Sequence, residues 1–114
     1  MKFERFEDII AWQKAKDLTV EIYTIIKKSK DFNYNNQITR ASISIMNNIA
    51  EGYERKSNNE FKLFLYISKG SCGEVRSMLR LGKELKYFTS YEFNKLTEMS
   101  ITLAKIISGL IKVL

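Results

Sequence analysis

Residues 48–55 read NIAEGYER and residues 64–71 read FLYISKGS, and these two stretches decide the fold. Apolar residues recur in both at steps of three and four, which is the period of an amphipathic helix. Charged and small residues interrupt both patterns, although a buried helix face gains nothing from them. The two stretches therefore predict two helices. Their polar and small residues are expected to make specific contacts with a neighbouring helix or subunit.

Further out along the chain, the same period predicts four helices, near residues 8–28, 36–55, 58–87 and 90–113. Ser57–Glu60 and Thr89–Glu92 match the capping box, in which a hydroxyl and a carboxylate satisfy two backbone amides at a helix start. The chain has no proline, as is typical of long uninterrupted helices. Because the links are short, sequential helices should alternate in direction. We therefore expect an all-α fold, an antiparallel up-down-up-down four-helix bundle that forms one domain over residues 1–114.

The composition limits what such a bundle could do. Of its 114 residues, 19 are basic and 13 acidic, and the net charge of +6 favours acidic partners. Histidine, the commonest general base and metal ligand, is absent, and Cys72 is the only cysteine, which fits a reducing cytosol. Acids near the start replace the apolar run of a signal peptide, and no apolar stretch approaches the roughly 18 residues of a membrane span. We expect a cytoplasmic, non-enzymatic protein with no catalytic residues, metal, cofactor, membrane contact or small-molecule substrate.

The chain resembles a bacterial four-helix-bundle family that is often encoded in intervening sequences of large-subunit ribosomal RNA genes. Thr39 and Ser68 stand where that family often has a basic residue and an alanine, and neither change challenges the fold. The resemblance covers almost the whole chain and rests on residues 12–15, 37–45, 48–52 and 64–71, together with Arg55 and Glu74.

This resemblance implies an antiparallel bundle that forms ring-shaped homo-oligomers, most often pentamers. The accessory protein of diversity-generating retroelements has a related fold. It is a basic, barrel-shaped pentamer that works with nucleic acid. The family brings no catalytic residues with it.

The second predicted helix also suggests self-association. Its apolar residues fall on two adjacent stripes that together cover more than half of the circumference. A helix at the edge of a lone bundle needs an apolar stripe of only about 100°. The excess predicts a second packed surface, and hence a homo-oligomer.

A group of polar residues lies on the same predicted helix. Asn48, Glu51 and Arg55 are spaced three and four apart, so they share one side, and Arg40 lies earlier toward the side of Glu51. A carboxylate between two guanidinium groups is a stable arrangement if the three meet. We interpret the four as a structural polar network that fixes helix register or a subunit contact; the alternative is a contact with a ligand or nucleic acid.

Glycines interrupt the third predicted helix at Gly70 and Gly73. Each costs about 1 kcal/mol relative to alanine in a helix interior. Close approach of a neighbouring backbone is the usual reason for such a glycine, and we expect it at both positions.

Basic residues form a stripe along the third predicted helix. Residues 58–87 hold six basic residues against three acidic ones, which is half of the protein's net charge. The stripe is either a solvated face or a nucleic-acid footprint, in which cations displace phosphate counterions. No base-reading motif accompanies it, so binding would be through backbone and shape. The candidate nucleic-acid-binding residues are Lys62, Lys69, Arg76, Arg80 and Lys83.

Two hypotheses for function follow. The first is a self-assembling helical bundle that binds nucleic acid, structured RNA above all, through the basic face of the third helix. The second is an oligomeric protein-interaction scaffold with no nucleic-acid role. The expected partners are further copies of the chain and, under the first hypothesis, RNA or DNA.

Overall fold

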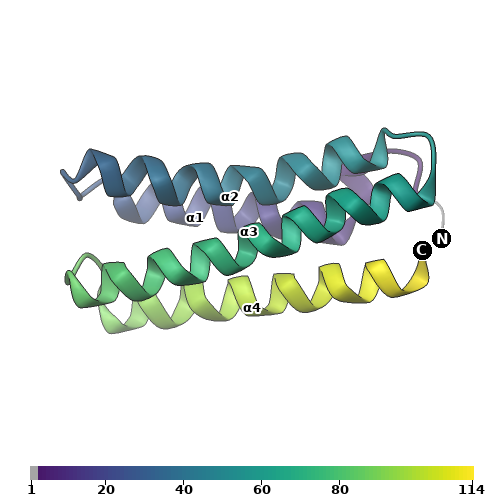
Figure 1. The fold of residues 1–114 in the computed structure, drawn as a ribbon. Helices are drawn as coiled ribbons and strands as arrows, with labels where there is room; N and C mark the ends of the chain where they lie inside the picture. The colour runs from purple at the N-terminus through teal and green to yellow at the C-terminus, as the bar shows by residue number, and fades with distance from the viewer. Residues whose placement is uncertain (1–2) are drawn as a thin grey trace.

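The computed structural model describes residues 3–114, and this part of the chain contains helices and no strand. A short 3-10 helix, Phe6–Asp8, precedes four α-helices, which confirms the all-α class and the expected four helices. Figure 1 shows the four packed lengthwise, with successive connections at alternating ends of the bundle. The α-helices are α1 (Ile10–Ile26), α2 (Phe32–Tyr53), α3 (Asn58–Glu84) and α4 (Ser90–Val113).

The two predicted capping boxes differ in how fully they form. At the start of α4, the Thr89 hydroxyl accepts from the Glu92 amide at 3.1 Å, and the Glu92 carboxylate accepts from the Thr89 amide at 2.9 Å. At the start of α3, Ser57 accepts from the Glu60 amide at 3.2 Å, but the Glu60 carboxylate meets the Ser57 hydroxyl instead of its amide. The first box is therefore confirmed, and the second is only half formed.

The start of α2 was predicted too late. The helix begins at Phe32 and not near residue 36, because the Asp31 carboxylate accepts from the Tyr34 amide at 3.1 Å and caps it. Asp31 is itself held by the hydroxyl of Tyr87, which donates to its other carboxylate oxygen at 2.6 Å. The cap thus depends on a residue from the connection between α3 and α4.

The end of α3 was also misplaced, at residue 87 instead of Glu84. Lys86 adopts the left-handed backbone conformation, with a φ of 62°. The next amide, of Tyr87, donates to the carbonyl of Gly82 at 2.9 Å, and the Lys86 amide donates to that of Lys83 at 3.0 Å. These two bonds form a Schellman motif, which ends the helix although no glycine stands at its left-handed position.

The core is a continuous layer of aliphatic side chains between the four helices. Small residues bring α2 and α3 close together, since Ser68 donates to the Ile45 carbonyl at 2.9 Å and the hydroxyls of Ser44 and Ser71 lie 2.9 Å apart. The fully buried side chains include Leu18 and Ile22 of α1, Ile38, Ile45 and Ile49 of α2, Leu65 and Leu79 of α3, and Leu96, Leu103 and Ile107 of α4. None of the helices formed by the described residues is long and apolar enough to cross a membrane.

The expected close approach at Gly70 and Gly73 does not occur within the chain. A Cβ at either position would meet no atom within 4 Å, because both face away from the rest of the chain. The close approaches lie instead at Gly52, where a Cβ would stand 2.6 Å from the Phe64 Cβ, and at Gly82, where it would overlap the Tyr34 hydroxyl. Gly52 and Gly82 lie on the apolar stripes of their helices, and Gly70 and Gly73 do not.

The wide apolar arc of α2 is partly covered within the chain. Met46 and Tyr53, from its second apolar stripe, pack against the core, and the Tyr53 hydroxyl donates to the Phe3 carbonyl. Large apolar side chains are exposed on α3 at Leu63, Ile67 and Leu81, and at Leu85 directly after it.

Candidate nucleic-acid interface

A basic groove runs between α3 and α4. Its volume is about 410 Å³. Lys69 and Arg76 of α3 and Lys105 and Lys112 of α4 supply its charges, and no carboxylate lines it. Each pair is seven residues, or two helical turns, apart, so the two cations of a pair fall on nearly the same side of their helix. The remaining lining residues are Ile101, Ala104, Ser108 and Gly109.

The four cations of this basic groove are exposed and not neutralised. Within residues 3–114, none of the four lies within 4.0 Å of a carboxylate oxygen. Some lysines elsewhere are paired, such as Lys28 with Glu92 at 2.8 Å and Lys95 with Glu21 at 3.4 Å. A concave surface lined by one sign of charge concentrates the opposite sign in solution. The basic groove is therefore the part of this surface best suited to a polyanion.

The other three candidate residues of the predicted stripe do not line the basic groove. Arg80 and Lys83 lie over the ring of Phe93 on α4, at 5.9 Å and 4.7 Å from its centroid. Such cation–π contacts stabilise the packing of α3 on α4 while leaving the charges near the surface. Lys62 is half-buried. The predicted stripe is therefore not one surface. Two of its residues line the groove, two pack on Phe93, and one lies toward the start of α3.

Sequence analysis missed Lys105 and Lys112. They are spaced seven apart on α4, as Lys69 and Arg76 are on α3. Because the links are short, α4 lies beside α3, and two stripes of equal period on neighbouring helices form the two sides of one groove. The equal seven-residue spacing on the two helices is the sequence signal that identifies Lys105 and Lys112.

The predicted polar network does not form within one chain. Glu51 contacts Arg55 at 4.0 Å, with both side chains about half exposed, while Asn48 donates to the Ser44 carbonyl at 2.8 Å. Arg40 is exposed and makes no ion pair with any residue of 3–114. Eleven residues of helix separate it from Glu51, or about 16 Å. The expectation that one carboxylate joins two guanidinium groups is therefore wrong for the single chain.

Arg55 instead links two helices. Its guanidinium lies 3.6 Å from Glu60 at the start of α3 and stacks over the ring of Phe64, 5.0 Å from the centroid. These contacts fix the connection between α2 and α3, and they give Arg55 a structural role.

The one cysteine of the chain, Cys72, is buried. Burial raises the pKa of the Cys72 thiol to about 12, and nearby Arg76 lowers it by a smaller amount, so the thiol stays protonated. No three acidic or thiol side chains of residues 3–114 lie close enough together to hold a metal ion.

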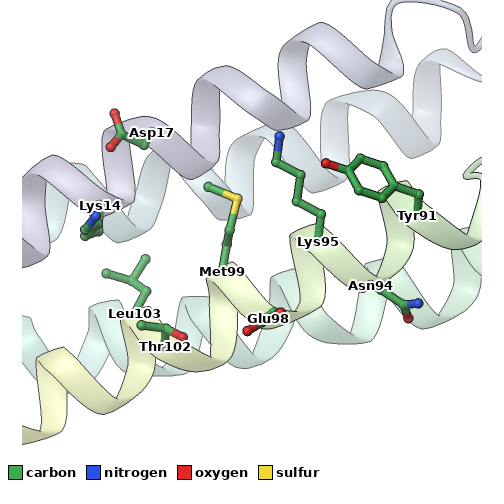
Figure 2. A pocket seen from close by; sticks show the side chains of 9 residues that line it. All are labelled: Lys14, Asp17, Tyr91, Asn94, Lys95, Glu98, Met99, Thr102 and Leu103. Carbon is green, nitrogen blue, oxygen red and sulfur yellow. The ribbon is translucent and has the colours of Figure 1, made fainter.

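A second, larger cleft lies between α1 and α4, with a volume of about 550 Å³. Figure 2 shows Met99 and Leu103 projecting from α4 toward α1. Each helix lines this cleft with one basic and one acidic residue, Lys14 and Asp17 from α1 and Lys95 and Glu98 from α4. Because these charges cancel, the α1–α4 cleft has no net attraction for a polyanion.

Three comparisons place the molecule among known proteins. A family model described as 23S rRNA-intervening sequence protein matches residues 7–109. A solved structure, of a protein of unknown function from the S23 ribosomal protein family of Bacteroides thetaiotaomicron VPI-5482, has a TM-score of 0.84 at 24% sequence identity. The similarity covers 90% of this chain and 99% of that one, and it shows the fold alone. A search of curated proteins finds no match.

Proposed function

The chain belongs to the 23S rRNA-intervening sequence protein family, and from this premise we propose that it is a non-enzymatic, cytoplasmic helical bundle that self-assembles and binds nucleic acid. The ligand class is structured RNA, and the contact surface is the basic face of α3 where it meets α4. The family description names no activity. The support for the proposal therefore comes from the charged surface of the molecule.

One observation carries the proposal: four cations line the basic groove, and no carboxylate does. Lysine and arginine that neutralise phosphates release condensed counterions, which supplies most of the affinity in binding that ignores sequence. The groove is lined by no asparagine, glutamine, aspartate or glutamate, the side chains that read adenine or cytosine edges. The proposed mode is therefore backbone and shape recognition.

The experiment is a salt titration of binding. A fluorescently labelled RNA hairpin is mixed with the protein, and fluorescence anisotropy gives the affinity between about 50 and 200 mM salt. Four phosphate contacts should make the logarithm of affinity fall by roughly three to four units per tenfold increase in salt. Failure to bind any structured RNA or DNA at about 50 mM salt would refute the proposal.

The second candidate function, an oligomeric scaffold, is favoured by a different surface. Leu63, Ile67 and Leu81 are exposed on α3 at 64%, 51% and 48%. Leu63, Ile67 and Gly70 follow the alternating steps of four and three that two helices use to pack in a coiled coil. Leu81 continues the same line after two polar positions, Glu74 and Ser77. This apolar line lies on another side of α3 from Lys69 and Arg76, so self-association and nucleic-acid binding could operate together.

We propose that antiparallel bundles assemble through the apolar line into a ring-shaped homo-oligomer, with the pentamer expected from the family resemblance. The exposed Gly70 supports this, because a helix glycine with no neighbour in its own chain leaves room for one from a second copy. Light scattering should give a multiple of the 13.4 kDa chain mass. The variant Ile67→Glu should give the mass of a single chain. A single-chain mass for the unmodified protein at micromolar concentration would contradict assembly.

A further inference from the structure

The shape of the basic groove limits what can lie in it. Adjacent packed helices have axes about 8–10 Å apart. The two cations on each side are about 10.5 Å apart along the helix, since each residue rises by 1.5 Å. Apart from the cations, the groove is lined by Ile101 and by three small residues, Ala104, Ser108 and Gly109. The groove therefore has room for one extended sugar–phosphate strand, which the cations would touch from both sides.

The chemistry of the groove limits the ligand further. Proteins that hold single strands combine a basic groove with aromatic side chains on which the bases stack. No aromatic residue lines this groove, and Ser108 is its only uncharged polar side chain. Tyr66, three residues before Lys69, is 57% exposed but is not among the lining residues. A strand held here would be held by its phosphates alone.

We infer that the basic groove holds one backbone strand of a double-stranded nucleic acid, so that the ligand is a duplex and not a single strand. In a duplex the strand is already ordered and its bases are already stacked. Phosphate contacts alone then suffice, because binding does not have to order a flexible chain. This inference rests on the proposed function and specifies its ligand.

The test compares double and single strands of one sequence. Four probes are used: an RNA duplex of about 16 base pairs, the DNA duplex of the same sequence, and one single strand of each. The duplexes should bind at least about 10-fold more tightly than their own strands. On the DNA duplex, four contacts predict a salt slope of about −3.6. The RNA and DNA arms identify which duplex is preferred.

A matched pair of variants tests the position. Ser108→Glu places a carboxylate inside the basic groove, one turn from both Lys105 and Lys112, where it can pair with them. Thr24→Glu makes the same change of charge at an exposed position of α1 that does not line the groove. Ser108→Glu should weaken duplex binding at least about 10-fold, and Thr24→Glu should weaken it less than about 3-fold. Lys105→Gln, an exposed substitution that leaves the core untouched, is the second variant in case Ser108→Glu fails to fold, and it should reduce the salt slope by about one unit.

Each outcome has a definite meaning. Duplex preference together with selective loss in Ser108→Glu supports the inference. Equal or tighter binding of single strands, weakened roughly 5-fold or more by Tyr66→Ala, overturns it while the proposed function stands. Equal losses from Ser108→Glu and Thr24→Glu also overturn it, because net charge would then explain the binding. If no probe binds, the proposed function fails and the inference fails with it.

Discussion

Gly52 of α2 lies directly against Phe64 of α3, and a Cβ on Gly52 would stand 2.6 Å from the Cβ of Phe64. The two residues belong to the two stretches of sequence that define the fold. Their contact involves the first atom of the Phe64 side chain, which cannot rotate away. The separation of α2 and α3 at this point is therefore set by the absence of a side chain at residue 52.

Gly52→Ala should accordingly destabilise the protein. Overpacking costs about 1–3 kcal/mol, and the better helix propensity of alanine offsets about 1 kcal/mol of it. We expect a net loss of up to about 2 kcal/mol in the free energy of unfolding, measured by urea denaturation. Gly73→Ala is the matched control. Its Cβ would meet nothing within 4 Å, so the single chain should become more stable by up to about 1 kcal/mol. Equal effects of the two substitutions would contradict this account of the α2–α3 contact.

Lys86 offers a stabilising substitution. Its left-handed backbone, with a φ of 62°, costs a residue with a Cβ roughly 1–2 kcal/mol. Lys86→Gly should remove this strain, partly offset by the greater freedom of glycine in the unfolded chain, for a net gain of about 1 kcal/mol. Lys83→Gly, inside the last turn of α3, should destabilise by a similar amount. Thermal unfolding of both variants checks the assignment, and a lower melting temperature for Lys86→Gly would disprove it.

The substitution Glu51→Ala tests whether Glu51 belongs to a buried polar network or to a surface ion pair. Glu51 is more than half exposed, and its contact with Arg55 is 4.0 Å long. Exposed pairs of this kind contribute about 0–1 kcal/mol. A loss of less than 1 kcal/mol is therefore expected, with assembly unchanged. A loss of about 3 kcal/mol or more, or a change in oligomer mass, would mean that Glu51 is buried between subunits.

Acid should weaken the protein through Asp31 and Glu92. The Tyr87 hydroxyl, followed by the Tyr34 amide, lowers the pKa of Asp31 below 3.8. The Lys28 ammonium, followed by the Thr89 amide, lowers the pKa of Glu92 below 4.5. A lowered folded-state pKa means that the stabilisation is complete above the unfolded value and is lost as pH falls through the folded value. The melting temperature should thus fall as pH decreases below about 4.5.

Asp31→Asn tests the assignment of this acid sensitivity. Asparagine can still cap α2 but carries no charge that titrates. The variant should show a flatter decline of melting temperature with acid, and Tyr87→Phe, which removes the donor to Asp31, should flatten it in the same way. If the decline in both variants is as steep as in the unmodified protein, other carboxylates control acid unfolding.

Local signals in the sequence predicted part of this structure well. The start of α4 at Ser90 follows from Thr89 and Glu92, which lie three residues apart and satisfy each other's backbone. The start of α2 at Phe32 could not be read in the same way, because the Asp31 cap is held by Tyr87. That partner is 56 residues away along the chain. Boundaries fixed by local bonds are predictable, and those fixed by tertiary contacts are not.

The candidate site was predictable in the same limited sense. The spacing of Lys69 and Arg76 indicated one basic face, but Lys105 and Lys112 belong to the site only because α4 packs beside α3. Conversely, Arg80 and Lys83 have the right spacing and yet contact Phe93. A stripe of charge on one helix predicts a surface, and only its neighbour determines which charges share a groove.

The direct test of nucleic-acid binding through the basic groove compares two double charge reversals. Lys69→Glu with Arg76→Glu removes the charges that α3 gives the groove, and both side chains are exposed, so folding should be preserved. Lys14→Glu with Lys27→Glu makes the same change of net charge on exposed positions outside it. Lys95 is unsuitable as a control, because its reversal would break the contact with Glu21.

Fluorescence anisotropy measures the binding of each double variant to a structured RNA from about 50 to 200 mM salt. The comparison shows whether the basic groove is the binding surface. The groove reversal should abolish binding, or at least lower the salt slope by about two units, while circular dichroism and oligomer mass stay unchanged. The control reversal should retain most of the affinity and the original slope. Equal losses from the two would contradict the account, since the basic groove would then contribute nothing beyond the net charge of the protein.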